Sequence, residues 1–110
     1  MADIKKCLCI DVGGTAIKHG VIDSQLDLSC KGEVVTPYEG VEAYLDALEQ
    51  IYRQAQDQVQ GIAMSVPGVI DSENGICISG GNLRFIQNYN LAEELGKRVN
   101  VPVSVMNDAK

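Results

Sequence analysis

The residues best suited to chemistry stand together near the amino terminus, in the segment from Asp11 to Lys18. Gly13 and Gly14 carry no Cβ and tolerate positive φ, so backbone N–H groups there can approach and cradle phosphate oxygens. Thr15 adds a hydroxyl, and Lys18 adds a positive charge. Asp11 cannot attract phosphate by itself, but it fits beside an anion cradle if Mg²⁺ lies between them, held through water. The pattern therefore predicts a site for a magnesium-bound nucleotide.

A simpler interpretation of the same segment stays open. Adjacent glycines between two strands are a common turn signal, so a ligand-free hairpin also explains Gly13 and Gly14. The segment is neither a Walker A loop, which needs Gly-x-x-x-x-Gly-Lys-Ser/Thr at the start of a helix, nor the Gly-x-Gly-x-x-Gly dinucleotide turn. Both interpretations place it in a hairpin. The apolar run at 7–10 predicts a strand covered on both faces, and residues 17–22 predict a second strand.

Composition narrows the class of protein. The chain has 110 residues, which supports one domain with one core, and we place that domain over residues 1–110. A formal net charge of −6 without a basic cluster argues against direct binding of nucleic acid. No apolar run approaches the roughly 20 residues of a membrane span, and the first residues lack the apolar region of a signal peptide. We therefore expect no membrane partner and a cytoplasmic location.

The cysteines and the histidine point to structure rather than chemistry. Without a secretory signal, Cys7, Cys9, Cys30 and Cys77 are expected to be buried, reduced thiols. Cys7 and Cys9 are spaced Cys-x-Cys, and no Cys-x-x-Cys or histidine pair completes a zinc site. His19 is expected to be a side chain on the face of a strand.

Hydrophobic periodicity predicts the order of the elements. A meander of three strands precedes two strands that join in parallel, because a helix crosses over before each of them. The expected elements are strands at 7–10, 17–22 and 28–35, a helix at 41–56, a strand at 59–66, a small hairpin at 69–78, a loop at 80–84, a helix at 91–99 and a strand at 101–106. These elements make an α/β fold with a mixed five-stranded sheet, flanking helices and a small hairpin insertion.

Each helix carries its own signal. Apolar residues recur at three- and four-residue spacing through the first helix, and Glu49 and Arg53 can pair across one of its exposed turns. Asn90 is a plausible N-cap of the second helix, with Glu93 at the position of a capping box.

Three of the strands end in polar or glycine-rich residues, at 11–15, 65–68 and 107–108. In open α/β sheets, ligands bind outside the carboxyl ends of the parallel strands, so we expect an active site at this edge. Asp108 follows an apolar run, and a desolvated carboxylate there can accept the proton of a substrate hydroxyl. Capping of a following helix is the alternative role for Asn107 and Asp108.

These motifs resemble a known family. Asp-x-Gly-Gly-Thr-x-x-Lys-x-Gly after a first strand resembles the phosphate motif of the superfamily of sugar kinases, heat-shock chaperones and actin, and within it the ROK family of sugar kinases and related repressors. Residues 65–68 are similar to the Gly-x-Pro-Gly turn of that family, with Ser65 in place of glycine. Residues 81–83 and 107–109 are similar to its asparagine-leucine and Asn-Asp-Ala segments. The resemblance implies a ribonuclease H-like lobe of the actin-like ATPase type.

The resemblance also implies a function, the transfer of the γ-phosphoryl group of ATP to a sugar or amino sugar with Mg²⁺ as cofactor. It makes Asp108 the catalytic base and gives Asp11 the role of organising Mg²⁺. It assigns substrate contact to the later segments, through Ser65, Pro67, Gly68, Asn82, Asn107 and Asp108. A strand-ending Pro-Gly turn and an asparagine in a glycine-rich loop explain several of these residues equally well.

The family proteins are much longer, with a second lobe that holds a structural zinc, a second phosphate loop and an adenosine pocket. We therefore expect an amino-terminal lobe that has little or no kinase activity alone, and a homo-oligomer at full length. A sugar-sensing regulator of the same family is an alternative, but it would carry a winged helix-turn-helix ahead of the first strand, where only 1–6 stand here. A remnant that only mediates assembly is a third possibility.

Overall fold

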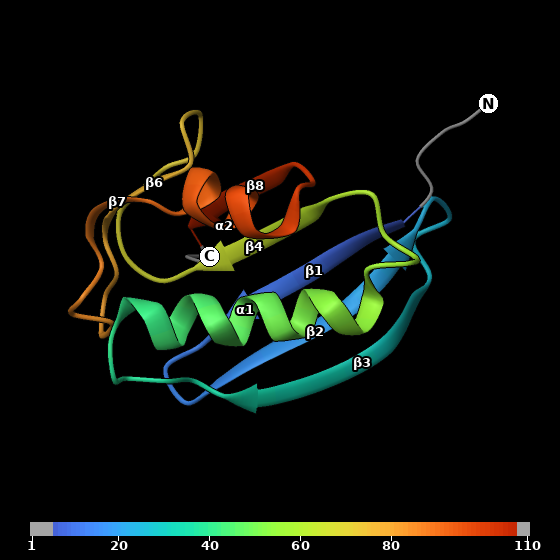
Figure 1. Cartoon of the computed structure of the whole chain (residues 1–110), viewed down its shortest axis with the longest axis horizontal. Coiled ribbons are helices and arrows are strands. Elements are labelled where there is room, and N and C mark those ends of the chain that lie inside the picture. Colours follow the sequence, from blue (N-terminus) through green and yellow to red (C-terminus); the bar gives the residue numbers. More distant parts are fainter. Residues whose placement is uncertain (1–5, 108–110) are drawn as a thin grey trace.

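The computed structural model describes residues 6–107. Figure 1 shows the elements of this part in chain order. They are β1 (Lys6–Val12), β2 (Ala16–Asp23), β3 (Leu28–Val35), α1 (Val41–Ala55), β4 (Ile62–Val66), β5 (Ile70–Asp71), β6 (Ile76–Ser79), β7 (Gln87–Asn90), α2 (Leu91–Val99) and β8 (Val103–Asn107). The strand β3 and the helix α2 begin and end at the residues that periodicity predicts.

The larger sheet has the strand order β3-β2-β1-β4-β8. The pairs β1–β2 and β2–β3 are antiparallel, and the pairs β1–β4 and β4–β8 are parallel. The predicted α/β class with a mixed five-stranded sheet is therefore confirmed. Its two parallel pairs follow from the crossovers through α1 and α2, since a helix between two strands returns the chain to the starting edge.

One face of β1 is buried and the other is not. Leu8 and Ile10 are buried among the core residues, whereas Cys7 and Cys9 are half-buried and Asp11 is exposed. The prediction of a strand covered on both faces is therefore wrong for the described residues. Cysteine is small and apolar, so it lengthens an apolar run while tolerating a partly open face.

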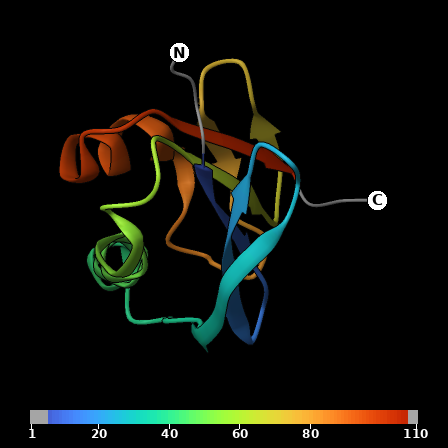
Figure 2. The same cartoon turned by 90° about the vertical axis from the view of Figure 1, so that its right-hand side faces the viewer.

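Both helices lie on the same side of the larger sheet (Figure 2). The predicted stripe of α1 is buried, and α2 buries residues at four-residue spacing, Leu91, Leu95 and Val99. Burying a side chain of this size contributes about 1.5–3 kcal/mol. The two helices thus seal one face of the sheet and fix the direction of β1, β4 and β8.

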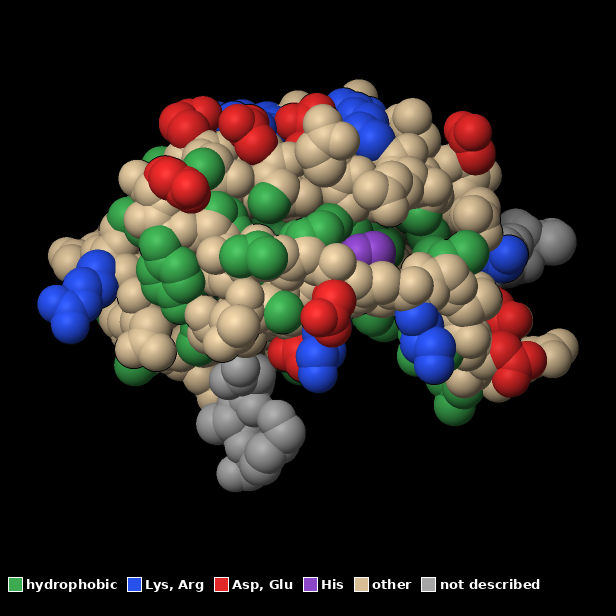
Figure 3. All heavy atoms as spheres, turned by 90° about the horizontal axis from the view of Figure 1, so that it is seen from below, with side chains coloured by type: hydrophobic (Ala, Val, Ile, Leu, Met, Phe, Trp, Pro, Cys, Tyr) green, Lys and Arg blue, Asp and Glu red, His purple; other side chains and the backbone are tan. Residues whose placement is uncertain are grey.

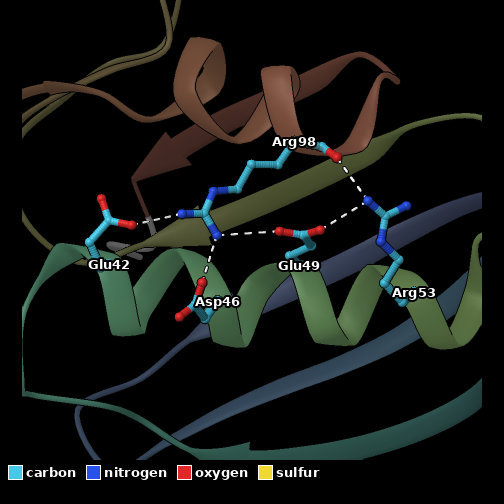
Figure 4. Close-up of polar contacts among 5 residues, drawn as sticks. All are labelled: Glu42, Asp46, Glu49, Arg53 and Arg98. Carbon is cyan, nitrogen blue, oxygen red and sulfur yellow. Dashed lines mark hydrogen bonds and ion pairs between the residues drawn. The ribbon is translucent and has the colours of Figure 1, made fainter.

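Charged side chains link the exposed sides of the two helices (Figure 4). Arg98 of α2 donates to Asp46 at 2.7 Å and to Glu42 at 2.9 Å, and it lies 3.3 Å from Glu49. Arg53 donates to Glu49 at 2.9 Å, which confirms the predicted pair, and to the Arg98 carbonyl oxygen at 3.0 Å. The hydrogen bond to Asp46 and the neighbouring carboxylates raise the pKa of Arg98.

The start of α2 follows its capping residue as predicted. The Asn90 side chain accepts a hydrogen bond from the Glu93 N–H at 3.1 Å, and its amide donates to the Glu93 carboxylate at 3.3 Å. The helix ends at Asn100, which adopts a left-handed conformation with φ of 63°. Both ends of α2 are thus encoded locally.

A smaller sheet of order β5-β6-β7 extends the predicted hairpin. The strands β5 and β6 pair as expected, but β7 pairs with β6 in a segment for which the sequence gives no strand signal. The residues of β7, Gln-Asn-Tyr-Asn, are mostly polar and show no apolar alternation. Tertiary pairing with β6, rather than local preference, makes this segment a strand.

All four cysteines are free, but they are not equally buried. Cys77 is buried, and burial raises the pKa of its thiol to about 11. Burial, together with the nearby Cys9, also raises the pKa of Cys7. Cys30 is exposed on β3 and Cys7 and Cys9 are half-buried, so the prediction of four buried thiols holds for Cys77 alone. Cys30 lies on this edge strand at the break in its register with β2, where its φ is 52°.

A groove lies on the sheet face that points away from the helices. It has a volume of about 730 Å³, and its lining includes Cys9, Lys18, His19, Ala63 and Met106. Hydrophobic side chains lie on both sides of the histidine (Figure 3). Partial burial lowers the pKa of His19, which lies on the face of β2 as expected. Neither helix in residues 6–107 has the length and hydropathy that a membrane span requires.

Candidate functional site

The carboxyl ends of β1, β4 and β8 form one edge of the larger sheet. In the register of these strands Asp11 lies opposite Ser65, and Val66 lies opposite Asn107. The Ser65 hydroxyl donates a hydrogen bond to the Asp11 carboxylate at 3.0 Å. The sheet therefore brings together residues from 11 to 107, as expected for strands that run in parallel.

The turn between β1 and β2 holds the glycine pair. The Gly13 N–H donates to the Ala16 carbonyl oxygen at 3.0 Å, and Lys18 lies opposite Asp11 in the hairpin register. Neither Gly13 nor Gly14 uses the positive φ that the sequence allows. Gly13 is needed here because it lacks a side chain: a Cβ on Gly13 would lie 3.0 Å from the Ala16 carbonyl oxygen, too close for an ordinary contact. Asp11 and Lys18 share one face of this hairpin.

The turn after β4 packs against the loop after β6. Gly68 has φ of 101°, and a Cβ there would overlap the Ser79 carbonyl group. The Val69 N–H donates to the Ser79 hydroxyl at 3.1 Å, and Gly81 approaches Pro67 closely. This close packing explains why glycine is needed after the proline.

The two asparagines of the site join these segments. The Asn107 side-chain amide at the end of β8 donates to the Gly68 carbonyl oxygen. Asn82 is exposed in the loop after β6, and its amide nitrogen would lie 3.8 Å from a Cβ on Gly14. The asparagine loop, the Pro-Gly turn and the hairpin therefore surround the same edge of the sheet. Asp108, the expected base, lies outside the described residues.

Two residues that the sequence did not single out contact the hairpin. The Thr36 hydroxyl donates to the Gly13 carbonyl oxygen at 2.9 Å, and the Tyr38 hydroxyl donates to the Gly14 carbonyl oxygen at 2.6 Å. A threonine and a tyrosine near a proline resemble an ordinary loop, so no local signal marks them. The pairing of β3 with β2 is what brings them to the hairpin.

Comparison with known proteins identifies the family. The model of the ROK family matches residues 7–110. The chain belongs to the ROK family. The match covers β1, the hairpin, the Pro-Gly turn and the whole of β8. The resemblance stated from the motifs is therefore confirmed, and the sheet that carries them is that of ROK sugar kinases, which have an actin-like ATPase fold.

Two curated ROK relatives are sugar kinases. The chain is 31% identical to a beta-glucoside kinase of Listeria innocua, an alignment that covers 94% of this chain and 35% of the relative. It is 32% identical to an N-acetyl-D-glucosamine kinase of Citrobacter koseri, with 90% of this chain and 33% of the relative covered. The chain thus spans about a third of the length of the curated relatives it matches.

A solved ROK structure shares the fold of this chain. The ROK family glucokinase from Streptomyces griseus, in complex with glucose and AMPPNP, superposes with a TM-score of 0.85 at 26% identity. The superposition covers 94% of this chain and 33% of the glucokinase chain. The β1–β2 hairpin, the Pro-Gly turn and the end of β8 all lie within a chain that is almost wholly covered.

Proposed function

We propose that this ROK chain is the amino-terminal lobe of an ATP-dependent kinase that phosphorylates a hydroxyl of a sugar or amino sugar. The observation that carries the proposal is the gathering of the β1–β2 hairpin, the Ser65–Gly68 turn, the Asn82 loop and Asn107 at one edge of the sheet. Sugar-kinase relatives, and a glucokinase neighbour that binds glucose and AMPPNP, support it.

The hairpin is assigned to the phosphates of the nucleotide. The N–H groups of Gly14 and Thr15 and the Thr15 hydroxyl would hold phosphate oxygens, and the Lys18 ammonium would neutralise part of their charge. Gly13 allows the tight turn that presents these groups. These groups follow the end of β1, so phosphates bound to them would lie next to the Asp11 carboxylate.

The donor set at this edge fits Mg²⁺. Among residues 6–107, no three His, Cys, Asp or Glu side chains gather to hold a metal by themselves. Nucleotide-bound Mg²⁺ needs only one or two carboxylates, since phosphates and water supply the remaining ligands. Ser65 binds one oxygen of Asp11 and thereby orients the carboxylate. When bound, the ion would neutralise charge that develops on the transferred phosphoryl group.

The other segments are assigned to the sugar. The Asn82 and Asn107 amides can donate and accept at once, which suits neighbouring hydroxyl groups, while Ser65, Pro67 and Gly68 would line the pocket. Asp108 would accept the proton of the attacking hydroxyl. The resemblance further leads us to propose a cytoplasmic homo-oligomer at full length, with any structural zinc in the part beyond residue 110.

The test is a coupled assay of ADP release by the full-length protein with glucose, N-acetylglucosamine and a β-glucoside. Asp108→Asn should lower turnover by more than about 100-fold while sugar binding is retained, because the base acts in the chemical step. Asp57→Asn, a change to an exposed acid after α1, is the matched control and should leave turnover unchanged. Normal turnover of Asp108→Asn would refute the assignment of the base.

A further inference from the structure

The segment that follows β3 donates hydrogen bonds to the hairpin between β1 and β2, the hairpin proposed to bind phosphate. Thr36 and Tyr38 donate their hydroxyl hydrogens to the carbonyl oxygens of Gly13 and Gly14, at 2.9 and 2.6 Å. The Thr36 N–H also donates to the Thr15 carbonyl oxygen at 3.0 Å. Three consecutive carbonyl groups of the hairpin are thus bound by two residues of one segment.

A bound carbonyl fixes the N–H that follows it. In a planar trans peptide, the C=O of one residue and the N–H of the next point in opposite directions. Holding the Gly13 carbonyl therefore fixes the Gly14 N–H, and holding the Gly14 carbonyl fixes the Thr15 N–H. Glycine rotates more freely than other residues, so these two peptide planes need an outside anchor.

The two N–H groups point away from the anchoring segment and stay available. Within residues 6–107, neither the Gly14 nor the Thr15 N–H has a hydrogen-bond acceptor. A pair of neighbouring N–H groups with fixed direction is the arrangement that binds phosphate oxygens. The carbonyl oxygens, which would repel an anion, are turned toward Thr36 and Tyr38.

We propose that Thr36 and Tyr38 are positioning residues for phosphate binding, acting through the Gly13 and Gly14 carbonyl groups. The inference rests on the proposed function, because it needs the hairpin to bind phosphate. Thr36 is 3% exposed and Tyr38 is 49% exposed. Tyr38 can therefore lose its hydroxyl with little effect on the core, which separates positioning from stability.

The experiment follows the amide signals of Gly14 and Thr15 by NMR as the ¹⁵N-labelled full-length protein is titrated with Mg-ATP. Tyr38→Phe and Thr36→Val should each weaken binding by about fivefold, since one net hydrogen bond contributes about 1 kcal/mol. Thr36→Ser keeps the hydroxyl and should bind within about twofold of the unaltered chain. The unfolding midpoint of Tyr38→Phe should fall less than that of Thr36→Val, because Tyr38 is 49% exposed and Thr36 is 3% exposed.

Ser29→Ala is the matched control. The Ser29 hydroxyl also donates to a carbonyl oxygen of β2, that of Val21 at 3.5 Å, but at the other end of the β2–β3 pair. Its loss should leave the affinity for Mg-ATP unchanged.

The outcomes distinguish failure of the positioning role from failure of the proposed phosphate binding. If the unaltered chain binds Mg-ATP and Tyr38→Phe binds equally well, the positioning role is overturned and the phosphate assignment stands. If the unaltered full-length protein shows no saturable shift of the Gly14 and Thr15 signals, the phosphate assignment fails and the inference fails with it. Should Thr36→Val not fold, Tyr38→Phe alone decides.

Discussion

At the scale of single residues, Ser65 shows how a substitution within a motif can be compensated. The resemblance of this turn to Gly-x-Pro-Gly implies glycine at this position in the family, and here the serine hydroxyl donates to Asp11 at 3.0 Å. A side chain thus occupies space that glycine would leave open, and it orients the carboxylate proposed to organise Mg²⁺. The sequence motif alone showed only that a serine stands where the similar family turn has glycine.

Cys77 gives the chain a predicted dependence on alkaline pH. Burial raises the pKa of its thiol from the usual 9.0 to about 11. Below pH 9 the thiol is neutral in both states and its contribution to stability is complete. Between pH 9 and 11 the unfolded thiol ionises while the folded one stays protonated, so the free energy of unfolding should fall by about 1–3 kcal/mol. Urea denaturation across this range measures the fall.

Two variants test the assignment to Cys77. Cys77→Ala should be less stable at every pH, but its free energy of unfolding should fall less between pH 9 and 11. Cys30→Ala, which removes an exposed thiol, should keep the full decrease. An identical pH profile for Cys77→Ala and the unaltered chain would contradict the prediction.

At the scale of elements, the contact between α1 and α2 depends on Arg98. Its side chain is 25% exposed and lies within 3.3 Å of carboxylate oxygens from Glu42, Asp46 and Glu49. Arg98→Ala would leave three acids on α1 without this cation. We expect a loss of about 1–2 kcal/mol at low salt, more than an isolated surface pair contributes, and a smaller loss in 1 M NaCl.

Chemical denaturation at two salt concentrations measures this loss. Lys97→Ala is the control, because Lys97 pairs with Glu93 and Glu94 on its own helix and is 62% exposed. It should cost only about 0.5 kcal/mol. Equal losses for Arg98→Ala and Lys97→Ala, or no dependence on salt, would show that the link between the helices contributes little.

The smaller sheet shows why an element can escape prediction. The strand β7 is polar, and it forms because β6 offers a free edge and the chain must return to the start of α2. By contrast, the ends of α2 were predicted to the residue, because Asn90 caps one end and apolar spacing sets the length. Local signals predict an element well only where the element is stabilised locally.

At the scale of the whole molecule, the helices cover one face of the larger sheet and leave the groove on the other. Met106 of β8 is 51% exposed and Leu28 of β3 is 49% exposed, and both line this groove from the two opposite edges of the sheet. Apolar surface of this kind binds hydrophobic dyes, so the folded chain should increase the fluorescence of anilinonaphthalene sulfonate. Met106→Lys should reduce that increase by about half or more, through loss of apolar area.

The control for the groove is Val69→Lys, since Val69 is 59% exposed and does not line the groove. It should leave the fluorescence nearly unchanged. Equal fluorescence for Met106→Lys and the unaltered chain would place the dye elsewhere and show that the groove is not the main apolar surface.

The sequence by itself determined the α/β class, the five strands of the larger sheet, both helices and the family, because apolar period, capping residues and motif spacing are local properties of the chain. The sequence also predicted that polar segments from three strands would meet at one edge, since parallel strands end together. The structure places residues 11, 65 and 107 at that edge, while Asp108 lies outside the described part and its role stays a prediction.

Only the tertiary structure decided which hydroxyls hold the hairpin, which thiol is exposed, and that Gly13 and Gly14 serve by lacking a Cβ rather than by adopting positive φ. Each of these depends on how strands pair across 20 residues or more, as Thr36 reaches Gly13 across 23 positions. A local sequence pattern does not predict such contacts, because the strand register that creates them is set by the packing of the whole sheet.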